Sequence, residues 1–179
     1  TPLKSIAAWR VQVETPKARY RELMDDFQIV GRRNVLCGLH IHVAVPPQVD
    51  RVVLMNRVLH WVPVFLALST SSPFWDREAS GLLSYRQSAY DEWPRTGIPD
   101  HFSDEAEYMR MADLLVKGGA MKDASYLWWT IRPALRFPTL ELRICDACTR
   151  LDDTLAIVAL YRCLVSVLAR RPDLVPAWT

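Results

Sequence analysis

The sequence has 179 residues, half of them apolar and 23% of them charged, with a formal net charge of +2 at pH 7. A chain of this length can bury about 70% of the surface that its unfolded form exposes, so we expect a single domain over residues 1–179. Its charges are mixed and form no basic run, which argues against a nucleic-acid groove and leaves anionic small molecules as ligands.

The cysteines and the longest apolar run both favour a cytoplasmic protein that makes no contact with a membrane. The four cysteines lie in apolar stretches, at positions 37, 145, 148 and 163, as is typical of reduced thiols. Cys145 and Cys148 form a lone Cys-x-x-Cys, for which a redox or zinc role is the less favoured interpretation. The charge-free run 58–75 is long enough to span a membrane. Because His60, Pro63 and a Ser/Thr cluster interrupt it, we expect a buried helix followed by a loop.

The first predicted helix follows Thr15 and Pro16, since threonine caps helices and proline is tolerated at the first helical position. Its apolar residues recur at helical spacing and predict a buried stripe of Tyr20, Leu23, Phe27 and Val30.

The stretch 35–46 alternates in the manner of a β-strand, with apolar residues on one face. The other face carries His40 and His42, whose rings could reach a common ion or phosphate, beside Gly38, which leaves room for a ligand to approach the backbone. Ordinary hydrogen-bonding histidines of a sheet are the alternative.

Asp50 is predicted to cap a helix over 51–68 that is apolar on most sides and kinked at Pro63. Residues 69–103 read as a long loop with a short helix at 81–90, and such loops are usually functional. Arg86 on this segment is a candidate for holding a carboxylate or phosphate, although a solvated arginine is the commoner role.

Two more helices are predicted in the second half of the chain. Asp104 with Glu107 resembles a capping box and predicts a helix that ends at Gly118-Gly119. Asp152 or Asp153 is expected to open the last helix, which closes at Arg170-Arg171-Pro172. Its buried residues are expected to be Leu155, Ile157, Val158, Leu160, Leu164 and Val167.

Two further stretches alternate like strands. In 138–146 the polar face carries Glu141 and Arg143, and in 126–132 it carries Thr130 and Arg132. If these strands join the histidine strand, one sheet face collects two histidines, one carboxylate and two arginines, a set that suits a nucleotide phosphate with its divalent cation. The short link between 132 and 138 favours an antiparallel α+β fold with helices packed on one face of the sheet.

Four motifs occur in order along the chain: Cys-Gly-Leu-His-Ile-His-Val, Ala-Leu-Ser-Thr-Ser-Ser-Pro-Phe-Trp, Ser-Tyr-Arg, and Trp-Thr-Ile-Arg-Pro followed by Pro-Thr-Leu-Glu-Leu-Arg-Ile-Cys-Asp. Together they resemble the type 2 glutamate-cysteine ligase family, a group of carboxylate-amine ligases. The resemblance implies a glutamine synthetase-like fold that binds ATP with Mg²⁺ or Mn²⁺. It also implies a reaction in which ATP phosphorylates the γ-carboxylate of glutamate, or of another acid, and an amine such as that of cysteine displaces the phosphate.

The resemblance also implies roles for individual residues. Glu141 and His40 are the implied metal ligands, and Arg132 and Arg143 are the implied catalytic residues beside the transferring phosphoryl group. His42 and Arg86 are implied to bind substrate. These roles agree with the chemistry of the side chains, since arginines can stabilise the charge that grows on phosphoryl oxygens.

The resemblance covers the central portion of the family's chain, because no segment here matches the acidic Gly-x-Glu-x-Glu strand that supplies most metal ligands in the family. A non-catalytic remnant that binds nucleotide weakly, or that serves in dimerisation, is therefore the main alternative, and the ligase itself could form a homo-oligomer. A metal hydrolase built on His40 and His42 is a weaker alternative, because Val43 and Ala44 stand where further ligands would be needed.

Overall fold

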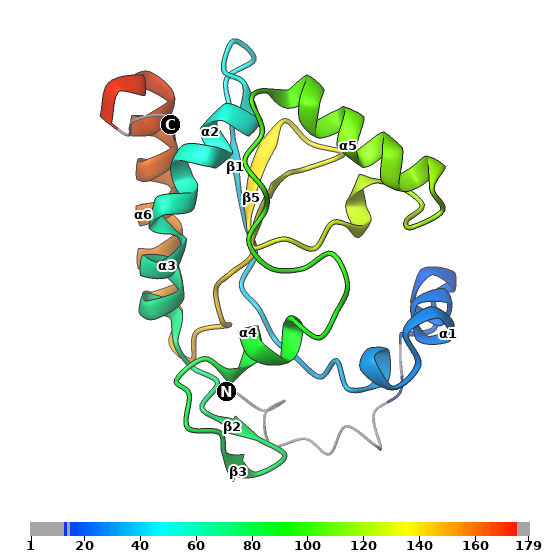
Figure 1. The fold of residues 1–179 in the computed structure, drawn as a ribbon. Coiled ribbons are helices and arrows are strands. Elements are labelled where there is room, and N and C mark those ends of the chain that lie inside the picture. The colour runs from blue at the N-terminus through cyan, green and yellow to red at the C-terminus, as the bar shows by residue number, and fades with distance from the viewer. Residues whose placement is uncertain (1–12, 14, 175–179) are drawn as a thin grey trace.

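The computed structural model describes residues 13 and 15–174 (Figure 1). The α-helices are α1 Ala18–Arg32, α2 Arg51–Val58, α3 Val62–Ser69, α4 Tyr85–Tyr90, α5 Glu105–Lys117 and α6 Leu151–Arg170. The strands are β1 Ile41–Ala44, β2 Phe74–Trp75, β3 Glu78–Ala79, β4 Ile131–Pro133 and β5 Thr139–Leu142. In the described part of the chain the 3₁₀ helices are η2 Leu59–Trp61, η3 Ala124–Tyr126 and η4 Pro172–Leu174.

The central sheet has the strand order β1-β5-β4, and both of its pairings are antiparallel. β2 and β3 form a separate small hairpin. The predicted α+β fold with an antiparallel sheet is therefore confirmed. The strands are shorter than their alternating stretches, because the flanking residues are held by single contacts such as the bridge between Gly38 and Asp146.

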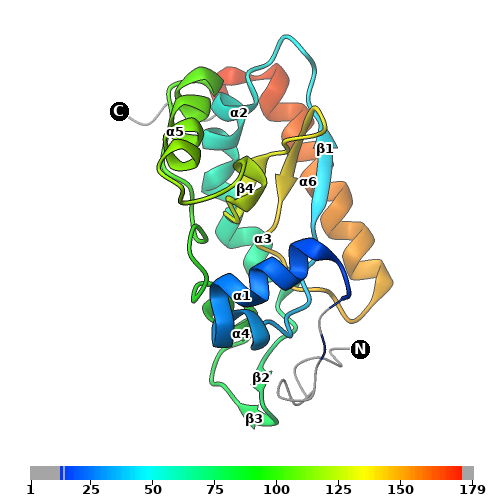
Figure 2. The same cartoon turned by 90° about the vertical axis from the view of Figure 1, so that its right-hand side faces the viewer.

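One face of the sheet is covered by helices, as predicted. Ile41, Ile131, Leu140 and Leu142 are all buried on this face, and Val43 is partly buried. α2 and α6 pack against it, and the buried Tyr161 of α6 donates a hydrogen bond to the Leu140 carbonyl at 3.3 Å. α1 lies on the opposite side of the sheet from α6 (Figures 1 and 2). The second face of the sheet is thus left for polar residues.

The helix predicted over 51–68 is divided, because residues 59–61 form the 3₁₀ turn η2 between α2 and α3. Pro63 causes this break, since it lacks the amide hydrogen that a continuous helix would use and occupies the first turn of α3. At the start of α2 the Asp50 carboxylate accepts from the Val52 and Val53 amides, which confirms the predicted cap.

Within the described part of the chain, one helical stretch, Arg51–Ser69, is apolar and long enough to cross a membrane by length and composition alone. A core helix of a soluble protein meets the same criterion. Val52, Met55, Val58 and Phe65 of this stretch are buried in the protein, which agrees with the predicted packing helix.

Both terminal helices begin differently from the prediction. Lys17 precedes α1, so Thr15 is not its N-cap, and Tyr20 is 41% exposed. Arg150 precedes α6, so Asp152 and Asp153 lie in its first turn, where they face the positive end of the helix dipole.

The buried side of α6 is also rotated from the predicted one. It consists of Ile157, Tyr161, Val165 and Leu168, which recur every three or four residues. Leu155, Leu160 and Val167 were expected inside and are exposed. In an almost uniformly apolar helix the sequence cannot indicate which side meets the sheet.

The strand predicted over 126–132 is mostly wrong, because only Ile131–Pro133 joins the sheet. The preceding residues pair with a different segment: the Trp128 and Thr130 amides donate to the Arg95 and Gly97 carbonyls at 2.8 and 2.9 Å. Both Trp128 and Trp129 are buried by this arrangement.

Candidate functional site

The polar face of the sheet carries a row of three side chains across its strands. Glu141 of β5 lies opposite His42 of β1 on one side and opposite Arg132 of β4 on the other. Directly opposed residues of antiparallel strands point to the same face, so the register alone brings these three together. The predicted shared face is confirmed.

Glu141 is the centre of the charge cluster and is only 4% exposed. Its Oε2 accepts from Arg132 Nε at 2.8 Å, and its Oε1 accepts from Arg143 Nη1 at 2.7 Å. Burial acts to raise the pKa of this carboxyl, but Arg143 and Arg132 outweigh burial and hold the pKa below its ordinary value. Glu141 is therefore ionised near neutral pH and orients both guanidinium groups.

His40 lies in the same cluster, one residue before β1. Its Nδ1 is 3.3 Å from Arg143 Nη1 and 3.5 Å from Glu141 Oε1. Burial, reinforced by the Arg143 charge, lowers the pKa of His40 to about 4. The ring is therefore neutral at pH 7 and its contact with Glu141 is no ion pair. Because arginine can only donate, we assign His40 Nδ1 as the acceptor and place the proton on Nε2.

Both arginines have further partners that fix their orientation. Arg132 Nη1 donates to the carbonyl oxygens of Ser125 and Leu127. Arg143 Nη2 donates to the Tyr90 hydroxyl at 2.9 Å. These hydrogen bonds fix the orientation of both charged guanidinium groups.

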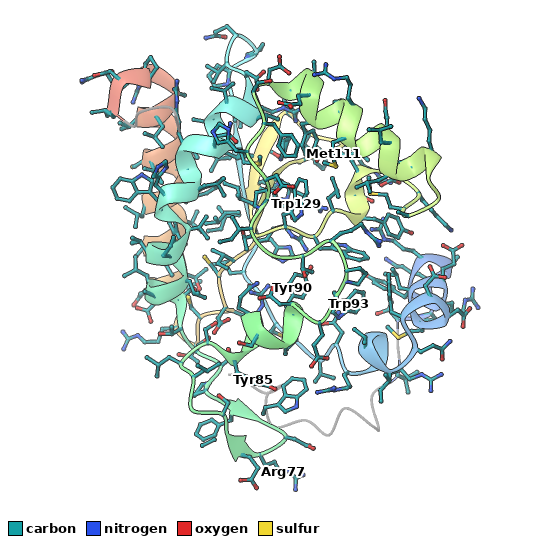
Figure 3. The ribbon with its side chains drawn as sticks, in the orientation of Figure 1. Arg77, Tyr85, Tyr90, Trp93, Met111 and Trp129 are labelled. Atoms are coloured by element: carbon teal, nitrogen blue, oxygen red, sulfur yellow. The ribbon has the colours of Figure 1, made fainter. Side chains whose placement is uncertain are left out.

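A cleft of about 750 Å³ opens beside this cluster. Among the described residues its lining contains four arginines and no Asp or Glu. These arginines are Arg19, Arg86, Arg132 and Arg143. The lining also includes Gly38 and His40 and the aromatic residues Tyr20, Tyr90, Trp93 and Trp128. Tyr90 and Trp93 reach from the end of α4 toward the space between the sheet and α1 (Figure 3). The cleft can therefore receive an anion, with aromatic surface beside it.

Two predicted site residues, His42 and Glu141, are not part of the cleft lining, and His42 is the one outside the arginine pairs. Its Nδ1 is 2.9 Å from Thr139 Oγ1, and its Nε2 is 3.6 Å from Glu141 Oε1. Its place on the shared face is as predicted, but its contacts are those of a hydrogen-bonding sheet histidine.

Arg86 lies in α4 and is only 4% exposed, so it is not the solvated arginine that its loop-like sequence favours. Its Nη1 and Nη2 donate to the carbonyl oxygens of Ile144 and Arg143 at 3.1 and 3.2 Å. The guanidinium occupies the space beside Gly38 in which we had expected a ligand. Burial lowers the pKa of Arg86, yet arginine stays charged in proteins.

Sequence reasoning missed Asp146, which fixes the segment 71–84 that leads into α4 and Arg86. This carboxylate is 1% exposed. Its oxygens accept from the Ser71 amide and from the hydroxyls of Ser72 and Ser84, at 2.7–3.0 Å. Ser72 in turn accepts from the Arg86 amide at 3.0 Å. The cluster of serines before an apolar stretch was the available signal for this network.

Arg19 and Tyr90 were missed as well. Arg19 enters the cleft lining from α1, and its Nη1 donates to Ser125 Oγ at 3.0 Å. No local sequence pattern indicates its role. Tyr90 stands four residues after Arg86, a spacing that places both on one side of a helix.

The cluster does not fit a magnesium or manganese ion. Mg²⁺ prefers oxygen ligands, whereas Glu141 is the one carboxylate of the cluster and both of its oxygens are bonded to guanidinium groups. Across residues 13 and 15–174, no group of three or more His, Cys, Asp and Glu side chains could hold a metal ion. The chemistry of these residues is that of an anion site.

The cysteines form no disulfide. Cys145 is buried, and burial raises the pKa of its thiol to about 11, which leaves it unreactive at neutral pH. Cys37 and Cys163 are exposed rather than enclosed in apolar surroundings as expected.

Comparison with known proteins finds relatives of this chain that are named as ligases. Residues 2–179 match the model of the glutamate-cysteine ligase family 2. A protein of Ectopseudomonas mendocina named "Putative glutamate--cysteine ligase 2" is 54% identical over 160 residues, which cover 89% of this chain and 42% of that protein. Proteins of the same name are 49% identical over 171 residues in a Bradyrhizobium species and 51% identical over 164 residues in Rhodospirillum rubrum. These alignments cover 96% and 92% of this chain. The chain spans 42% of the length of each of these relatives.

Proposed function

The chain belongs to the glutamate-cysteine ligase family 2, and from this premise we propose that its complete protein is an ATP-dependent carboxylate-amine ligase that forms a γ-glutamyl type of amide. Membership of a ligase family points to small-molecule substrates. Residues 1–179 would form the central part of the catalytic domain, in a cytoplasmic protein. The observation that carries the proposal is the cleft, whose described lining holds four arginines and no acidic residue.

The proposed reaction has two steps. A carboxylate oxygen of glutamate attacks the γ-phosphorus of ATP, and the bond to the leaving ADP breaks. The nitrogen of an amine then attacks the acyl carbon, phosphate departs with the bonding electron pair, and the nitrogen loses a proton. Both steps bring anions together and move negative charge between oxygens, so positive groups that are already oriented would lower the barrier.

Arg143 is the residue best prepared for this role. Glu141 and Tyr90 bind its two Nη atoms, so the guanidinium need not reorganise when charge develops. Arg132 is fixed in the same manner by Glu141 and by two backbone carbonyls. We propose that both stabilise the phosphoryl oxygens, while Arg86 and Arg19 supply further positive charge to the anionic substrates.

We propose no step through a metal ion on these residues, because their donor set does not fit one. A divalent cation would bind to the complete protein together with the nucleotide. The absence of a suitable ligand cluster among the described residues favours the second candidate, a nucleotide-binding or dimerisation remnant without catalysis.

The deciding experiment measures ADP release by the complete polypeptide with Mg-ATP and glutamate, with and without cysteine. We expect glutamate-dependent ADP release, which Arg143→Ala lowers by about two to three orders of magnitude. Arg150→Ala is the matched control, because this side chain is 73% exposed and pairs only loosely with Asp152 at 3.8 Å. Binding of Mg-ATP without any glutamate-dependent turnover would favour the remnant and refute the ligase.

A further inference from the structure

The Arg86 guanidinium lies against the backbone of Gly38. A Cβ atom placed on Gly38 would be 2.3 Å from Arg86 Nη2, 2.6 Å from Cζ and 2.8 Å from Nε. Real Cβ atoms essentially never approach other atoms so closely. Any side chain at position 38 would therefore displace the guanidinium.

Arg86 is held in this place from both of its ends. The guanidinium donates to two carbonyls of the segment that follows Leu142, and its Cζ is 5.5 Å from the centroid of the Tyr90 ring. The backbone end is tied through Ser72 to Asp146. Asp146 also forms an isolated β-bridge with Gly38. Asp146 therefore fixes the positions of both Gly38 and Arg86.

These hydrogen bonds do not neutralise the charge of Arg86. Its hydrogen-bond acceptors are neutral carbonyls, and within residues 13 and 15–174 no Asp or Glu forms an ion pair with it. Arg143, by contrast, is paired with Glu141. Both arginines line the cleft and share contacts with Tyr90. The buried Asp146 carboxylate acts on Arg86 electrostatically but forms no ion pair with it, so Arg86 brings a positive charge without a direct counter-ion to the cleft wall next to Arg143.

We propose that Gly38 is a positioning residue, which by having no side chain keeps the Arg86 guanidinium in the cleft wall, where it binds an oxyanion of the ligand together with Arg143. The ligand group is a carboxylate or a phosphoryl group, since both match a planar guanidinium. This inference rests on the proposed function for the identity of the substrates, but not for the binding of an anion.

Gly38→Ala tests the proposal with a small structural change. The atoms that the new methyl group meets belong to the far end of the Arg86 side chain, so that side chain can move without a shift of the backbone. We expect the dissociation constant of inorganic phosphate, measured by calorimetry on the complete polypeptide, to rise about tenfold to a hundredfold. Gly118→Ala at the end of α5, outside the cleft lining, should leave it unchanged.

A double-mutant cycle separates positioning from general damage to the fold. If Gly38 acts only through Arg86, then Gly38→Ala should have no further effect on phosphate binding once Arg86→Ala has removed the guanidinium. That background also removes the steric conflict, so the double variant keeps the test valid if Gly38→Ala alone folds poorly. Additive losses from the two substitutions would overturn the proposal, and so would unchanged phosphate affinity in Gly38→Ala.

Separate titrations identify the anion. A higher KM for glutamate with an unchanged KM for ATP assigns Arg86 to the carboxylate, and the reverse result assigns it to the phosphoryl group. Failure of this inference is distinct from failure of the proposed function. Turnover that is insensitive to Gly38→Ala would refute only the positioning role, whereas phosphate binding that depends on Gly38 in a protein without turnover would refute only the ligase. A complete polypeptide that binds no phosphate would overturn the positioning role.

Discussion

Two buried carboxylates on one stretch of chain, Glu141 in β5 and Asp146 shortly after its end, are satisfied in opposite ways. Glu141 is bound by the charged side chains of Arg132 and Arg143. Asp146 is bound by one amide and two serine hydroxyls, all neutral donors. The first arrangement fixes cations at the cleft, and the second fixes a loop. The same functional group therefore serves the site at one position and its scaffold at the other.

The two carboxylates should differ most in how much stability is lost when the charge of each is removed. Glu141→Gln leaves the buried Arg143 and the partly buried Arg132 without their counter-ion, so we expect the free energy of unfolding to fall by about 3–5 kcal/mol. Urea denaturation measures this loss. Glu22→Gln, which breaks the exposed pair with Lys122, is the control and should leave the midpoint close to that of the unsubstituted protein. A Glu141→Gln variant as stable as this control would show that the buried cluster does not need its anion.

Asp146→Asn should cost less, because all hydrogen-bond donors to Asp146 are neutral and its charge acts on Arg86 without a direct ion pair. The new amide group presents hydrogens to donors that need an acceptor, for an expected loss of about 1–3 kcal/mol in unfolding free energy. Ser84→Ala removes one of the donors and should cost about 0.5–1.5 kcal/mol. A loss in Asp146→Asn as large as that in Glu141→Gln would contradict the distinction between the two carboxylates.

His42→Ala tests the outer edge of the Glu141 cluster. Its side chain is 41% exposed and makes one hydrogen bond, to Thr139, so we expect an unfolding free energy lower by about 0.5–1 kcal/mol. Glutamate-dependent ADP release should stay within about threefold of the unsubstituted rate, a change worth about 0.7 kcal/mol in the barrier. A drop as large as that expected for Arg143→Ala would place His42 in the reaction instead.

Acid should destabilise the folded protein through protonation of His40 in the Glu141 cluster. We expect this effect to be smaller than those of the substitutions above, because the His40 side chain is 40% exposed. Its pKa is about 4 in the folded protein and about 6.5 in the unfolded chain. Between these values only the unfolded chain binds the proton, so unfolding free energy should decrease as pH falls from 6.5 to 4. His40→Gln should flatten this decrease. Titration of the His40 ring by NMR checks the value directly, and an apparent pKa above 6 would refute it.

The alternation of the stretches 35–46 and 138–146 was enough to predict the polar face of the site. Successive side chains of a strand point to opposite faces, so residues two apart share a face. This rule places His40 with His42, and Glu141 with Arg143. The Asp50 and Asp104 caps were also predictable from the local sequence, because each carboxylate accepts from an amide two or three residues away. These features depend on neighbours in the chain.

The tertiary structure decided which groups bond to Glu141 and whether Arg86 was buried. Arg86 contacts a carbonyl 57 residues away, and Ser72 contacts Asp146 across 74 residues. No local period encodes such pairings, and the same holds for the segment 126–130, whose Trp128 and Thr130 amides donate to the carbonyls of Arg95 and Gly97. The sequence by itself therefore determined which residues face the site, through backbone geometry. Only the fold decided which charges neutralise one another, since that depends on distances between segments remote in the chain.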